Sequence, residues 1–269
     1  MAAITTRISH EDFVDDSTTT LTASSTASGS AVANLQSDFV AKTWQATGKT
    51  DENVVFDLGS AKNTKVAGIF GHNFTSAATV TLQANATDSW GAPTYSQALT
   101  VEVDALSDVI PKIVFFLDQT YRYWRIRIQD TGNANNVEMG RVWLGSYFQP
   151  TYNFNSGFRV DVVKPDFVER PDIGGPYGAK RPSYEVISFG WDAGTNPLPT
   201  ADRETMEAIW RKVGKTLPTL LVYDSLNDPS VTGIFGFFEN DGLARSHGVT
   251  TNFGTEGLVL REEVGWNYT

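Results

Sequence analysis

Apolar and polar residues alternate along three segments in the first half of the chain, and a half-buried antiparallel strand requires this period of two. In the last of these segments, Trp124 and Ile126 fall on one face, whereas Arg125 and Arg127 fall on the other. The alternating segments are 54–58, 80–84 and 121–128, and the turn clusters between them are Gly59-Ser60, 88–93 and 131–136. The pattern predicts a β-sandwich in this half of the chain.

A second β-rich region follows Pro150 and contains the one clear helical pattern, over residues 201–213. Thr200 is placed to cap this helix and Gly214 to end it. Its apolar stripe, which we assign to the core and not to a partner-binding face, consists of Met206, Ile209, Trp210 and Val213. The predicted strands are 152–163, 184–191, 219–223, 233–239, 249–253 and 257–261, and a loop rich in Pro and Gly is predicted over 165–182.

These patterns divide the 269 residues into three parts. Residues 1–19 form an N-terminal arm, residues 20–149 the sandwich, and residues 150–269 a β-domain with one helix. The predicted fold class is therefore mainly β.

The composition excludes several kinds of chemistry. The chain has no Cys, so disulfides, thiolate nucleophiles and Cys-based metal sites are excluded. Its three His lack metal-ligand spacing, and the sequence motifs of nucleotide-binding, serine-hydrolase and zinc-protease sites are missing. We therefore expect no enzymatic activity and no cofactor.

Charge and hydropathy bear on partners and location. The formal net charge of −10 should repel free nucleic acid. No apolar stretch is long enough to span a bilayer, and the first residues lack the apolar core of a secretory signal. We expect a protein that is either made and used in the cytoplasm or leaves the cell by lysis.

Short motifs follow one another along residues 20–149. They are Thr43-Trp44-Gln45-Ala46, Phe56-Asp57-Leu58-Gly59, the aromatic and Arg-rich run 121–128, and the closing run 138–145. Their order and spacing resemble the galactose-binding-like, or discoidin, family of jelly rolls. The resemblance implies core packing for Trp44 and ligand contacts, where they occur, from loops at one end of the sandwich. It also allows a structural Ca²⁺, whose ligands the sequence does not identify.

The whole architecture, a jelly roll joined to a small β-domain with one helix, is similar to minor tail, distal-tail and baseplate proteins of tailed bacteriophages. This second resemblance implies a structural virion component that forms a homo-oligomeric ring. Its partners would be tail-tube, hub and tape-measure proteins, and a host surface glycan is a further candidate. DNA would pass the lumen without being bound. The alternative function is a standalone carbohydrate-binding, lectin-like module.

The best candidate for sugar contact is the turn around Gly91. Trp90 and Tyr95 are its aromatic residues, and His72, Asn85 and Asp88 are candidates for hydrogen bonds to hydroxyls. The alternative for Trp90 is that it covers an edge of the core or lies in a subunit interface.

Charged residues complete the candidates. We expect Arg122, Arg125 and Arg127 to pair with carboxylates across strands. Asp12, Asp15 and Asp16 form an acidic cluster without the spacing of a Ca²⁺-binding loop. The candidates for an acidic channel wall in a ring are Asp224, Asp228, Glu239 and Asp241. The alternative for these four is an ordinary solvated surface.

Overall fold

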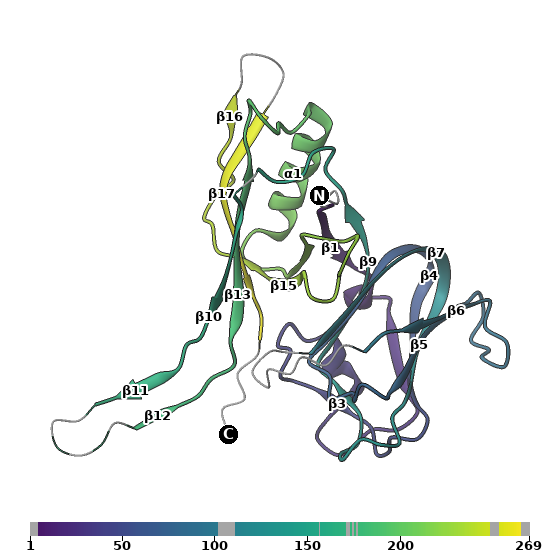
Figure 1. The fold of residues 1–269 in the computed structure, drawn as a ribbon. Coiled ribbons are helices and arrows are strands. Elements are labelled where there is room, and N and C mark those ends of the chain that lie inside the picture. Colours follow the sequence, from purple (N-terminus) through teal and green to yellow (C-terminus); the bar gives the residue numbers. More distant parts are fainter. Residues whose placement is uncertain are drawn as a thin grey trace.

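The computed structural model describes residues 5–101, 111–155, 157–170, 173, 175, 177–247 and 253–264. Antiparallel strands dominate this part of the chain, and its single α-helix lies in the second half (Figure 1). The predicted fold class, mainly β with one helix after the sandwich, is confirmed. No helix among the described residues is long and apolar enough to cross a membrane.

The first half forms a β-sandwich. Its strands are β2 (Thr20–Ala23), β3 (Trp44–Gln45), β4 (Glu52–Phe70), β5 (Thr79–Asn85), β6 (Tyr95–Leu99), β7 (Lys112–Gln129), β8 (Glu138–Met139) and β9 (Arg141–Phe148). Two short 3₁₀ helices, η1 (Phe13–Asp15) and η2 (Val32–Gln36), precede β3. The large buried side chains include Trp44 and Trp124, so the predicted core position of Trp44 is confirmed.

The long strand β4 carries the chain from one layer of the sandwich to the other. Its first part pairs with β2 and its last part with β9, while β7 accompanies both parts. The register between β4 and β7 shifts between Asp57 and Lys62, where Gly59 has a φ of +74°. The prediction that a strand ends in a turn at Gly59-Ser60 is therefore wrong. Gly59-Ser60 is a bend inside one strand, because the partner strand β7 bends with it.

The second half is a sheet covered on one face by the helix α1 (Thr200–Val213). Its strands are β10 (Arg159–Val163), β13 (Tyr184–Trp191), β14 (Thr219–Val222), β15 (Gly233–Phe238), β16 (Ser246–His247) and β17 (Phe253–Glu262). Met206, Ile209 and Val213 are buried in this core, and Trp210 packs at its edge against Phe238. The assignment of the helical stripe to the core is confirmed.

Some predicted boundaries differ from the structure. The residue before α1 is Pro199 and makes no side-chain cap, so Thr200 is the first helical residue and not its cap. The strand predicted from residue 152 begins at Arg159. Most of the strand predicted over 249–253 lies outside the described residues, and Phe253 begins β17.

The N-terminal strand β1 (Arg7–Asp12) joins the two halves. It pairs with β14 on one side and with β9 on the other, so strands of both halves belong to one continuous 13-stranded sheet, while β3 pairs with β8 and β11 with β12 outside it. Gly145 of β9 allows the close approach of β1, since a Cβ at this position would lie 1.9 Å from the carbonyl oxygen of Glu11. Residues 1–19 are predicted as an N-terminal arm; within its described part, β1 is an internal strand of the sheet and η1 follows it.

Between β10 and β13 the chain extends away from both cores as a narrow hairpin (Figure 1). Two short strands, β11 (Phe167–Glu169) and β12 (Tyr177–Ala179), pair within it where a loop was predicted. All of their residues are exposed. We call the described residues from Lys164 to Pro182 the hairpin arm.

The buried stripe of α1 predicts the effect of Met206→Ala. Met206 has no exposed surface, so the variant should lose about 2–5 kcal/mol of unfolding free energy through the lost burial and the cavity left behind. Urea denaturation measures this value. Glu204→Ala, on the exposed side of the same helix, should stay within about 0.5 kcal/mol of the parent protein. Equal losses in the two variants would contradict the assignment.

Candidate functional site

The turn between β5 and β6 holds Trp90 at the surface of the sandwich. The side chain of Asn85 organises this turn, because its amide donates to the carbonyl oxygen of Ser89 at 2.7 Å. Its carbonyl oxygen accepts from the hydroxyl of Thr94 at 2.9 Å. Asn85 therefore has a structural role in the turn.

Three side chains come together where this turn meets β7. The indole Nε1 of Trp90 donates to Oδ1 of Asp88 at 2.6 Å, and the guanidinium of Arg125 lies 4.6 Å from the centre of the indole ring. Asp88 is exposed, and Trp90 and Arg125 are half-buried. We call Asp88, Trp90 and Arg125 the Trp90 platform. It combines an aromatic surface, a carboxylate and a cation, which are the groups that recognise sugars and their substituents.

Tyr95 begins β6 and lies beside the turn. It is half-buried, and its ring meets the edge of Trp124 at a centroid distance of 6.1 Å. Burial raises the pKa of its hydroxyl. Tyr95 thus supports the turn from the core side.

The three arginines of β7 have different partners. Arg122 and Arg127 make ion pairs with Asp57 at 2.7 Å and with Asp51 at 2.6 Å, as predicted. These hydrogen bonds lower the pKa of both carboxyl groups. Arg125 instead donates from Nε and Nη2 to the side-chain oxygen of Gln83, at 2.8 and 2.5 Å. The prediction that Arg125 pairs with a carboxylate is therefore wrong for the part of the chain that the structure describes. The neutral amide of Gln83 lies opposite Arg125 on β5.

His72 does not belong with the platform. It is 4% exposed and follows the end of β4, where its ring stacks on Phe74 at 4.5 Å. Its Nδ1 accepts from the backbone N–H of Phe74 at 3.2 Å. Since the imidazole is buried at another site, the prediction that it contacts sugar together with Trp90 is corrected.

Burial lowers the pKa of His72 to about 4, which is below the ordinary value of 6.5 that applies to the unfolded chain. Between these values the unfolded state binds more protons, so His72 makes the fold less stable as the pH falls from 6.5 to 4. His72→Asn keeps an acceptor for Phe74 but does not titrate. The slope of unfolding free energy against pH should therefore decrease in this window by up to about 1.4 kcal/mol per pH unit. Urea denaturation at several pH values measures this slope. The same slope in His72→Asn and in the parent would contradict the lowered pKa of His72.

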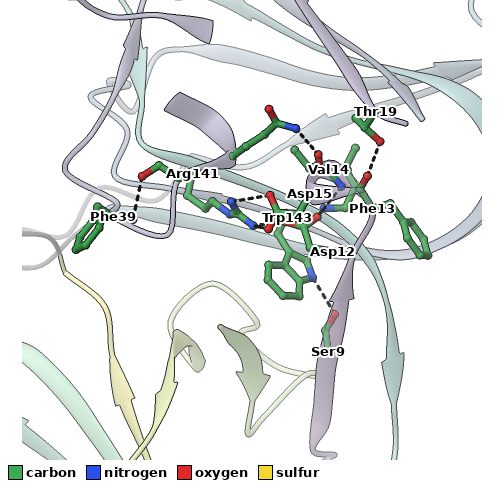
Figure 2. A network of polar contacts seen from close by, with 12 residues as sticks. Ser9, Asp12, Phe13, Val14, Asp15, Thr19, Phe39, Arg141 and Trp143 are labelled. Carbon is green, nitrogen blue, oxygen red and sulfur yellow. Dashed lines mark hydrogen bonds and ion pairs between the residues drawn. The ribbon is translucent and has the colours of Figure 1, made fainter. Parts of the chain in front are cut away.

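A second polar cluster lies at the junction of the two halves, centred on Arg141 (Figure 2). The side chain of Arg141 is fully buried and donates to Asp12 at 2.5 Å and to Asp15 at 2.5 and 3.0 Å. Asp12 also accepts from the backbone N–H groups of Val14 and Leu144. Burial raises the pKa of Asp12, and Arg141 acts against this rise. We call Asp12, Asp15 and Arg141 the Arg141 cluster.

The Arg141 cluster is structural. It connects the end of β1 and η1 to β9, and Trp143 of β9 reinforces the connection by donating from its indole to the hydroxyl of Ser9 at 2.8 Å. A cavity of 380 Å³ lies beside the cluster. Its lysines are engaged, Lys62 with Asp16 and Lys212 with Glu11. The acidic run at 12–16 thus binds cations of the chain itself, and no group of three metal-binding side chains occurs among the described residues.

Removal of the buried cation should weaken the whole molecule. Arg141→Met leaves the carboxylates of Asp12 and Asp15 without their partner, and we expect a loss of about 3–5 kcal/mol of unfolding free energy. Adding Asp12→Asn and Asp15→Asn removes the uncompensated charges and should restore part of the loss. Chemical denaturation of the parent, the single variant and the triple variant measures both effects. A triple variant less stable than Arg141→Met would contradict this account.

The four candidates for a channel wall lie in two places. Asp224 and Asp228 precede β15, where they bond to Asn227 and to the N–H of Val231. Glu239 and Asp241 follow β15, where they pair with Arg261 and Lys215. Each pair thus lies at its own end of a six-residue strand. Their orientation toward a channel in an assembly stays a prediction.

No protein-family model matches the chain, and no curated protein matches it. Solved structures that resemble it include carbohydrate-binding modules. The chitosan-binding module 1 of a chitosanase/glucanase from Paenibacillus sp. IK-5 is 20% identical, with a TM-score of 0.38 over 51% of this chain and 100% of the module. A fucose-binding module of Streptococcus pneumoniae, SpX-3, is 10% identical, with a TM-score of 0.39 over 51% of this chain and 99% of its own.

The lectin domain of lectinolysin, solved with Lewis B antigen, is 12% identical. Its TM-score is 0.39, over 50% of this chain and 95% of the lectin domain. The likeness to these modules thus takes in about half of the chain.

Proposed function

We propose that this chain is a non-enzymatic carbohydrate-binding protein and that the Trp90 platform contacts the sugar. The observation that carries the proposal is the placement of Trp90 at an exposed turn, directly beside Asp88 and Arg125. An indole ring stacks on the apolar face of a sugar, and an adjacent carboxylate accepts hydrogen bonds from its hydroxyl groups. The resemblance of residues 20–149 to the discoidin family supports the same class of function.

The platform is held in place before any ligand arrives. Asn85 fixes the turn, Gln83 fixes the guanidinium of Arg125, and both strands belong to the sandwich. A site whose side chains are already positioned loses little conformational entropy on binding. This rigidity favours a binding function for the turn.

Trp90→Ala tests the proposal. The variant should bind polysaccharides at least about tenfold more weakly than the parent, because stacking and hot-spot aromatic residues contribute energies of this order. Affinity electrophoresis against a panel of neutral and acidic polysaccharides gives the dissociation constants. Phe39→Ala is the matched control, since Phe39 is a 67% exposed aromatic residue outside the platform. The proposal fails if the parent protein binds no polysaccharide of the panel. It also fails if Trp90→Ala binds as tightly as the parent.

The hairpin arm favours a second candidate, an assembly subunit. Its apolar side chains are exposed, Phe167 at 45%, Val168 at 58% and Ile173 at 94%. An isolated two-stranded hairpin is marginal in water, and contiguous exposed apolar residues are typical of protein contacts. We propose that the arm contacts a neighbouring subunit, as the tailed-phage resemblance implies for a ring-forming tail protein.

Mass measurement in solution tests the assembly role. The parent protein should form closed oligomers, and Phe167→Ser together with Val168→Ser should shift it toward the monomer. Lys180→Ser, an exposed polar position of the same arm, should leave the mass unchanged. A monomeric parent at all concentrations would contradict self-assembly and leave the carbohydrate-binding proposal in place.

A further inference from the structure

Arg125 differs from the other arginines of β7 because it has no carboxylate partner among the described residues. The two other arginines of β7 have carboxylate partners, Arg127 with Asp51 and Arg122 with Asp57. No carboxylate lies within ion-pair distance of Arg125 among the described residues, although the chain carries 31 acidic and only 21 basic residues. Two carboxylates act on Arg125 electrostatically, Asp51 more strongly than Asp88. Asp51 is already paired with Arg127, and Asp88 already accepts a hydrogen bond from Trp90.

The guanidinium of Arg125 keeps donors available for a ligand. An arginine has five N–H donors. Two are directed at Gln83, so three remain on the terminal nitrogens. The group is held from two sides, by the 7% exposed Gln83 and by the indole of Trp90. A fixed guanidinium with free terminal donors is suited to a planar carboxylate, which it binds through two parallel hydrogen bonds.

Asp88 limits which anionic ligands the Trp90 platform can bind. One oxygen of its carboxylate accepts from Trp90, and its exposed position leaves the other oxygen for a hydroxyl donor. A ligand densely covered with sulfate would meet repulsion from this carboxylate. A sugar that carries one carboxylate and free hydroxyl groups satisfies Arg125, Asp88 and Trp90 together.

We infer that the Trp90 platform recognises a uronic acid, with the carboxylate of the sugar on Arg125, its hydroxyl groups on Asp88 and its ring against Trp90. This inference rests on the proposed carbohydrate-binding function and specifies its substrate class. Recognition of the carboxylate supplies the counter-charge that the sheet itself does not provide for Arg125.

Alginate and its highly esterified form, propylene glycol alginate, test the inference, because they share a backbone and differ in charge. The parent should bind alginate at least about tenfold more tightly, a difference typical of one charge-assisted pair. Arg125→Gln should lose this preference and bind both polymers alike. Arg127→Gln removes a cation already paired with Asp51 and should keep the preference. Trp90→Ala should weaken binding of both polymers.

The outcomes separate the inference from the proposed function. Equal affinity of the parent for alginate and its ester would overturn the inference while the carbohydrate-binding function stands. So would tighter binding of dextran sulfate than of alginate, or a preference that survives in Arg125→Gln. Binding to neither alginate polymer, nor to any neutral polysaccharide of the panel, would remove the proposed function itself. Thermal melting of each variant confirms that the fold is retained.

Discussion

A fully buried arginine holds together the part of the molecule on which both halves depend. Arg141 lies at the start of β9, and its two carboxylate partners are Asp12, the last residue of β1, and Asp15, the last residue of η1. Because an unpaired charge at this depth costs several kcal/mol, positions of the β1 end that bring Asp12 and Asp15 to Arg141 are strongly favoured. The observed position places β1 between β9 and β14, and the two halves thereby share one sheet.

The shared sheet also determines how the Trp90 platform is presented. Arg125 lies in the part of β7 that pairs with both β4 and β5, so its backbone has little freedom to move. Trp90 belongs to a turn, but Asn85 and the adjacent strands restrict it. The platform thus combines a rigid cation with an aromatic group on a pinned turn. The hairpin arm lacks such support. None of its strand residues is buried, and it lies apart from both cores.

Local patterns predicted the elements that bury one face, and these were the strands of the sandwich, β13 and the stripe of α1. Alternation and helical spacing are properties of neighbouring residues, so sequence displays them directly. The junction was not predictable in this way, because Asp12 and Arg141 are 129 residues apart and nothing local connects them. The platform was predicted in part. Trp90 and Asp88 were found through the turn, while Arg125 was assigned to a carboxylate because strand register, which places Gln83 opposite it, is a non-local property.

The position of β1 in the sheet has a consequence for the order in which the chain folds during synthesis. The hydrogen bonds from Ser225 to Thr5 span 220 residues, so β14 meets β1 only when most of the chain has been made. The Arg141 cluster, in contrast, uses residues 12 to 141, and all of them emerge with the sandwich. Contacts of long sequence separation form slowly because loop closure costs entropy. The completed sandwich can therefore hold β1 in place as a template, and the later strands of the second half add to its free edge.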